Sequence, residues 1–95
     1  MIDFAKRITV AGDVLVRELD GEAVLLNLDN ESYYGLDDVG TVFWTALSHS
    51  SSIDEAYQRL LKEFDVEAEQ LKSDLQAFMK DLLAQGLIRV HEDAA

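Results

Sequence analysis

The sequence has 95 residues, a hydrophobic fraction of 48%, no cysteine and a net charge of −11. A chain of this length supports one domain with one modest core, and the lack of cysteine excludes disulfides, thiolate metal sites and thiol nucleophiles. The acidic excess repels phosphates, and no apolar run approaches the roughly 20 residues that span a bilayer, so we expect a cytoplasmic protein without nucleic-acid or membrane partners.

Two strands are predicted after a weakly patterned N-terminal arm. The arm, residues 1–13, packs irregularly, stays flexible or adds a short extra strand. The segments Val14–Leu19 and Ala23–Leu28 are rich in Val and Leu, and Asp20-Gly21 between them is typical of a type I′ turn. The two segments are therefore expected to form an antiparallel hairpin.

A third strand is predicted over Ser32–Leu36. It follows a turn signal at Asp29-Asn30, where Asn tolerates the left-handed region. The result is a meander whose first and third strands are edges, with backbone groups that lack partners on one side. Tyr33 and Tyr34 combine large contact area with polar tips, which suits a recognition surface and equally suits the cover of a sheet.

The hydrophobic period then changes from two to 3.6, which indicates helices. The first helix is capped by Asp37 or Asp38, and Trp44 lies off the centre of its apolar stripe, where it covers a core edge or takes part in a contact. The second begins after a polar break, at Ser52 and Glu55, which have the spacing of a capping box.

The third helix is the longest and spans about Glu67 to Gln85. Gly86 follows it, where a left-handed C-cap is expected. A helical apolar stripe is ordinarily core, and one or two of its members are expected to reach a groove. The stripe consists of Leu71, Leu75, Phe78 and Leu82, widened by Met79 and Leu83.

Three strands followed by three helices predict an α+β domain, in which the helices cover one face of the antiparallel meander. Winged-helix domains share this size and these parts, although shared parts do not decide function. We expect the domain to span residues 14–90, with a frayed tail over residues 91–95.

The sequence offers no organised catalytic grouping, so we expect no enzyme activity and no cofactor. His49 and His91 lack helix-spaced ligand partners and are expected to be solvated surface residues rather than metal ligands. Asp74 and Asp81 lie seven apart on the third helix, which predicts a shared solvated or partner-facing stripe.

DNA recognition is disfavoured by the charge of the third helix, the one that would enter a groove. Its acidic residues would be repelled by phosphates. Four acids stand against two bases: Glu67, Glu69, Asp74 and Asp81 against Lys72 and Lys80.

The edge of the third strand beside the last helix remains as a site. An extended peptide added there would gain main-chain hydrogen bonds, while apolar helix side chains select its residues. The candidate peptide-binding residues on this strand and helix are Glu31, Ser32, Tyr33, Tyr34, Gly35, Leu71, Asp74, Leu75, Phe78 and Met79.

The passage from Leu-Asn-Leu, residues 26–28, to Tyr-Tyr-Gly-Leu, residues 33–36, is similar to PqqD-like proteins. The resemblance covers about Val14 to Ile88 and is most specific in that passage. It includes Asp65-Val66 before the last helix and the stretch from Asp74 to Phe78 that leads to Gly86-Leu87-Ile88. The sequence of these segments resembles the standalone modules of lasso-peptide pathways more than the pyrroloquinoline quinone protein. Ser48–Ser52 departs from the family, which often has a glycine-containing turn there.

The resemblance implies a winged-helix-like recognition element that captures the leader segment of a ribosomally made precursor peptide. The leader would lie antiparallel along Ser32–Leu36 and against the last helix near Leu71, Asp74, Leu75 and Phe78. By the same resemblance, the partners are a leader peptidase and an ATP-dependent cyclase or another modifying enzyme. Two alternatives stay open: a general protein-interaction subunit of a biosynthetic complex, and a winged-helix DNA-binding regulator.

Overall fold

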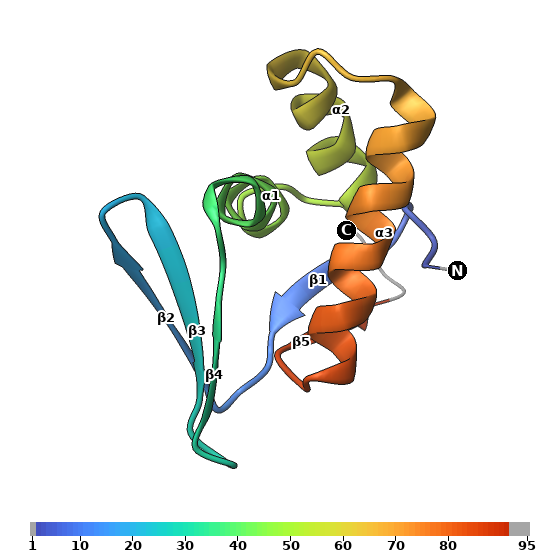
Figure 1. Ribbon diagram of the computed structural model, residues 1–95. Helices are drawn as coiled ribbons and strands as arrows, with labels where there is room; N and C mark the ends of the chain where they lie inside the picture. The colour runs from blue at the N-terminus through green and yellow to red at the C-terminus, as the bar shows by residue number, and fades with distance from the viewer. Residues whose placement is uncertain (1, 92–95) are drawn as a thin grey trace.

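The computed structural model describes residues 2–91, which form two antiparallel sheets and three helices (Figure 1). The three-stranded sheet has the order β2 (Val14–Leu19), β3 (Glu22–Asn27) and β4 (Ser32–Gly35). All neighbours in it are antiparallel, so the predicted meander and the α+β class are confirmed. The sheet projects from one side of the helices.

The β2–β3 turn has the predicted form, because Asp20 and Gly21 have φ angles of 54° and 82°. The turn predicted at Asp29-Asn30 is present, and its left-handed residue is Glu31, with φ 58°. Asn30 instead uses its side-chain oxygen to accept a hydrogen bond from the backbone N–H of Ser32 at 3.0 Å. The β3–β4 loop is longer than a two-residue turn, and its left-handed position falls directly before β4.

Local signals place the first and third helices. In α1 (Asp38–Ser48), the carboxylate of the N-cap Asp37 accepts a hydrogen bond from the N–H of Gly40 at 2.7 Å. α3 (Ala68–Ala84) ends before Gly86, whose φ is 72°, as predicted for a left-handed C-cap.

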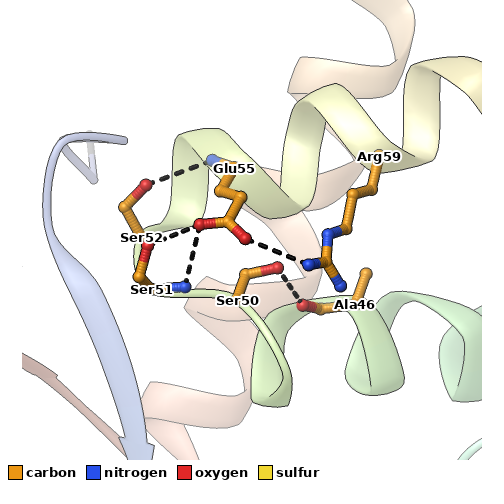
Figure 2. A network of polar contacts seen from close by, with 6 residues as sticks. All are labelled: Ala46, Ser50, Ser51, Ser52, Glu55 and Arg59. Atoms are coloured by element: carbon orange, nitrogen blue, oxygen red, sulfur yellow. Dashed lines mark hydrogen bonds and ion pairs between the residues drawn. The ribbon is translucent and has the colours of Figure 1, made fainter.

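The connection between α1 and α2 (Ile53–Glu63) is held by polar contacts, drawn in Figure 2. The Ser52 hydroxyl accepts a hydrogen bond from the Glu55 N–H at 3.1 Å, which confirms the predicted cap. The Glu55 carboxylate, however, accepts from the hydroxyl and the N–H of Ser51, and it pairs with Arg59 at 3.1 Å. The Ser51 hydrogen bonds, with Arg59 in a smaller role, lower the pKa of Glu55.

The second sheet joins the two ends of the described chain. β1 (Arg7–Val10) pairs antiparallel with β5 (Ile88–His91). An extra strand was one of several structures expected for residues 1–13, and β5 was not predicted. His91, expected to be a solvated surface residue in a frayed tail, instead pairs in the ladder, and its Nε2 lies 2.6 Å from the Thr9 hydroxyl oxygen. The rest of the predicted tail, residues 92–95, lies outside the described residues.

The segment before β1 also packs on the helices. The carbonyls of Phe4 and Lys6 accept hydrogen bonds from the N–H groups of Asp54 and Ile53, both at 2.8 Å. These donors lie in the first turn of α2 and have no partners within the helix. The arm therefore completes the cap of α2.

One core lies between the helices and the inner face of the three-stranded sheet. Trp44 is buried in it, in agreement with the first of its two expected roles. Within residues 2–91, no helix is long and apolar enough to cross a membrane. The core residues are Val14, Ala23, Leu25, Leu36, Phe43, Trp44, Leu47, Ile53, Ala56, Leu60, Leu71, Leu75, Met79, Leu82, Leu87 and Ile88.

Candidate functional site

The outer edge of β4 carries no paired strand within residues 2–91, because the sheet order places β4 at its border. Hydrogen-bonded and non-hydrogen-bonded pairs alternate in an antiparallel ladder. The N–H of Leu36 bonds to the carbonyl of Ala23 at 2.8 Å, so the Leu25–Tyr34 pair is also hydrogen-bonded. The backbone groups of Tyr33 and Gly35 consequently point away from β3, toward the open edge.

The register on the other side of β3 agrees with this assignment. The N–H of Leu28 bonds to the carbonyl of Asp13 at 2.8 Å, so the even-numbered residues of β3 bond to β2. Its odd-numbered residues are therefore left for β4. Tyr33 and Gly35 thus present two N–H donors and two carbonyl acceptors at the edge.

The helix α3 lies beside this edge (Figure 1). One side-chain contact connects them, since the Tyr34 hydroxyl donates a hydrogen bond to the Asp81 carboxylate. This bond, with desolvation and the charges of Asp81 and Asp37 in smaller roles, raises the pKa of Tyr34 to about 12. The phenol is therefore a neutral donor at physiological pH. Asp81 was not among the residues assigned to the site from the sequence.

Burial divides the predicted residues of α3 into two groups. Leu71, Leu75 and Met79 are buried in the core, with exposed fractions of 2%, 0% and 0%. Asp74 is exposed and accepts a hydrogen bond from the Gln70 side chain at 2.8 Å, whereas Phe78 is half-buried. Only Asp74 and Phe78 of this predicted set have accessible side chains.

Phe78 is held in place by the start of α1. Its ring meets that of Phe43 edge to face, with centroids 5.6 Å apart and planes at 82°. A Cβ atom added at Gly40 would lie 3.5 Å from the Phe78 ring, 3.4 Å from Leu36 and 3.2 Å from the Asp37 carboxylate. The absence of a side chain at Gly40 therefore allows α1, the end of β4 and Phe78 to approach closely.

Asp74, Phe78 and Asp81 follow one another at spacings of four and three residues on α3. Residues at these spacings share one side of a helix. The stripe offers one aromatic ring between two carboxylates. Its spacing was visible in the sequence, but the core stripe beside it has the same period.

The strand residues of the site lie at the surface. Glu31, Ser32, Tyr33 and Gly35 are exposed, and Tyr33 retains 76% of its accessible surface. Tyr34 is partly buried because its side chain turns toward α3. The structure thus connects β4 to α3 through Tyr34 and Asp81, and it places Phe78 close to Leu36 at the end of β4.

The part of the chain from residue 2 to residue 91 contains no group of three His, Asp or Glu side chains able to hold a metal ion. His49 is exposed, as expected.

A cavity of about 570 Å³ lies between β1 and the α1–α2 connection, away from β4, and its lining includes Arg7, Thr9, Trp44, Ser48, Ser50 and Ser51.

Comparisons with known proteins give two kinds of match. The family model described as coenzyme PQQ synthesis protein D (PqqD) matches residues 22–88. The solved structure of TbiB1 in complex with the TbiA(beta) leader peptide is 28% identical, with 88% of this chain and 98% of that chain covered and a TM-score of 0.77. A lasso peptide synthetase B1 complexed with its leader peptide is similar in fold, at 24% identity, coverage of 87% and 98%, and a TM-score of 0.76. No curated protein matches the sequence significantly.

Proposed function

Because this chain belongs to the PqqD family, we propose that it is a non-catalytic adaptor that binds the leader segment of a ribosomal precursor peptide and delivers it to processing enzymes. The observation that carries the proposal is the unpaired outer edge of β4. TbiB1, the relative of similar fold, is in complex with a leader peptide, which supports the same class of ligand here.

The leader adds to β4 as a fourth, antiparallel strand. The outward backbone groups of Tyr33 and Gly35 allow four hydrogen bonds, each with a net contribution of roughly 0.5–1.5 kcal/mol. We expect an overall affinity of nanomolar to micromolar order, about −8 to −12 kcal/mol, because the leader loses conformational entropy when it binds. Main-chain bonds alone do not reach that range, so side-chain contacts must supply the remainder.

Phe78 supplies the apolar part of those contacts. It is the half-buried aromatic residue of the α3 stripe, and it lies close to the end of β4. A leader residue on the inner face of the added strand would pack against this ring. Asp74 and Asp81 border it, whereas burial removes Leu71, Leu75 and Met79 from direct contact with the peptide.

The delivery step requires separate enzymes. A leader peptidase and a cyclase, or another modifying enzyme, would act on the precursor while this chain holds its leader. Since ribosomes release the precursor into the cytoplasm, we place this work there. The proposal requires no cofactor, because strand addition involves only hydrogen bonds and packing.

The edge is tested by comparing Tyr33→Pro with Tyr33→Ala in titrations of a fluorescent cognate leader peptide. Proline removes the outward N–H, and an edge strand tolerates proline where that N–H faces solvent. Alanine removes the same side chain and keeps the N–H. We expect Tyr33→Pro to bind the leader roughly two- to twelvefold more weakly than Tyr33→Ala, which corresponds to the loss of one bond worth about 0.5–1.5 kcal/mol.

The fold of both variants is checked by circular dichroism and thermal unfolding. Tyr34→Pro is a poorer test, because the N–H of Tyr34 faces β3 and its loss would weaken the sheet itself. Equal leader affinity of folded Tyr33→Pro and Tyr33→Ala would exclude β4 as the docking edge.

A further inference from the structure

The three-stranded sheet has a second surface that the leader edge does not use. Side chains alternate between faces along a strand, and Ala23 and Leu25 of β3 point into the core. The opposite face, called the outer face here, therefore carries the alternate residues of each strand. Its apolar residues are Leu15, Leu19, Val24, Leu26 and Tyr33.

These apolar residues form a continuous row. Leu15 pairs with Leu26, and Leu26 pairs with Tyr33, so the three side chains stand side by side across β2, β3 and β4. Leu15 is 48% exposed and Tyr33 is 76% exposed. A contiguous exposed apolar patch with a polar rim marks an interaction site more often than scattered single residues do.

The exposure of apolar side chains is most evident in β2. Of its six residues, Val14 alone is buried, and its other apolar residues are Leu15 and Leu19 on the outer face and Val16 on the inner face. Edge strands of soluble proteins ordinarily carry charges, prolines or bulges that discourage association. Arg17 and Glu18 are the charged residues of β2, and Leu19 is 65% exposed at its end. Folding of the domain does not account for these exposed side chains.

The charges around the outer face indicate what covers it. From residue 13 to residue 35 there are six acidic residues and one basic residue, Arg17, and all seven are exposed. A second copy of this chain would bring a second set of acids and a second charge of −11 to the same interface. A partner with lysines and arginines around an apolar centre complements this rim. The acids are Asp13, Glu18, Asp20, Glu22, Asp29 and Glu31; Glu18 pairs with Ala23 and so lies on the inner face, whereas Arg17 pairs with Val24 and lies on the outer face.

We propose that the outer face docks a separate protein, a processing enzyme of the bound precursor, through an apolar patch rimmed by lysines and arginines. This proposal rests on the proposed function for the identity of the enzyme. The surface itself is continuous with the leader edge, because a strand added to β4 extends the row Leu15–Leu26–Tyr33 by one residue. An enzyme on the outer face would thus contact the outward side chains of the leader.

The test compares Leu15→Glu with Val66→Glu. Both residues are 48% exposed, and each variant adds one negative charge. Val66 belongs to the connection between α2 and α3, which Figure 1 shows away from the three-stranded sheet. Binding of the purified cognate leader peptidase is measured by biolayer interferometry. Binding of the fluorescent leader is measured separately. Leu15→Ser and Val66→Ser repeat the comparison without added charge and provide the readout if Leu15→Glu does not fold.

We expect the Leu15 variants to bind the peptidase at least about tenfold more weakly, with Val66 variants and all leader affinities within about twofold of the unaltered chain. Added salt should weaken binding of the peptidase to the unaltered chain, since exposed charges are screened. The proposal would be overturned if the Val66 variants lost as much peptidase affinity as the Leu15 variants, or if the Leu15 variants lost none. It would also be overturned if the unaltered chain did not bind the peptidase.

Sedimentation analysis of the unaltered chain and of Leu15→Glu tests whether a second copy of this chain covers the outer face instead. A dimer that Leu15→Glu dissociates would assign the face to a second copy and overturn the proposal. If the chain does not bind the leader but its binding of the peptidase still depends on Leu15, the proposed function is refuted and the docking face is retained.

Discussion

Two neighbouring residues of α3, Leu75 and Phe78, should respond to alanine substitution in opposite ways. Leu75 is completely buried, so Leu75→Ala leaves a cavity and should cost about 2–5 kcal/mol of unfolding free energy. In a domain of this size each kcal/mol lowers Tm by roughly 4–8 °C, so Tm should fall by at least about 8 °C. The leader affinity should stay within about twofold at a temperature where the variant is folded.

Phe78 is half-buried and half available to the peptide. Phe78→Ala loses the edge-to-face contact with Phe43, worth roughly 0.5–1.5 kcal/mol, together with part of the burial of its ring. Its Tm should therefore fall less than that of Leu75→Ala, while leader binding should weaken at least about tenfold. Circular dichroism melts and leader titrations on the same samples give both quantities.

Leu75→Met provides the control, because a swap that conserves volume ordinarily costs less than about 1.5 kcal/mol. A folded Leu75→Met that binds the leader tenfold more weakly would place Leu75 in the peptide contact. The reasoning from burial would also be refuted if Phe78→Ala bound the leader as well as the unaltered chain does.

Two further substitutions test the contacts that hold the site. The pKa of Tyr34 is raised to about 12 from an ordinary value near 10, so its bond to Asp81 stabilises the fold fully below about pH 10 and is lost as pH rises through 12. Tyr34→Phe should therefore be less stable than the unaltered chain at neutral pH, with a difference that shrinks above pH 10 in urea unfolding; a difference independent of pH would contradict this. Gly86→Ala places a Cβ at φ 72° and should cost about 1–2 kcal/mol in the same assay, whereas Gly12→Ala, with open space around it, should change stability by less than about 0.5 kcal/mol.

The elements that the sequence predicted are those defined by local chemistry. Asp20-Gly21 fixes the first turn, and Ser52 and Gly86 bound helices through contacts within a few residues. The pairing of β1 with β5 joins Arg7 to His91, at opposite ends of the described chain. Each of these strands has four residues, and nothing within either one identifies its partner.

The site was predictable in outline but not in its boundary. An open third-strand edge follows from strand order, and the apolar stripe of α3 follows from its period. The same period describes the buried side of the helix, so it cannot separate Leu75 from Phe78. That separation depends on how α1 approaches α3, which Gly40 permits. The Tyr34–Asp81 contact joins residues 47 apart and depends on the same packing.

β4 can serve both proposed partners at once because its backbone and its side chains point in different directions. The free N–H and carbonyl groups of Tyr33 and Gly35 lie in the plane of the sheet, whereas the Tyr33 side chain stands roughly perpendicular to it on the outer face. A leader strand would therefore leave the Leu15–Leu26–Tyr33 row uncovered and would lengthen it by one side chain. An enzyme on that row would then contact more surface when the leader is present, so the two ligands should bind this chain cooperatively, each raising the affinity of the other by the same factor.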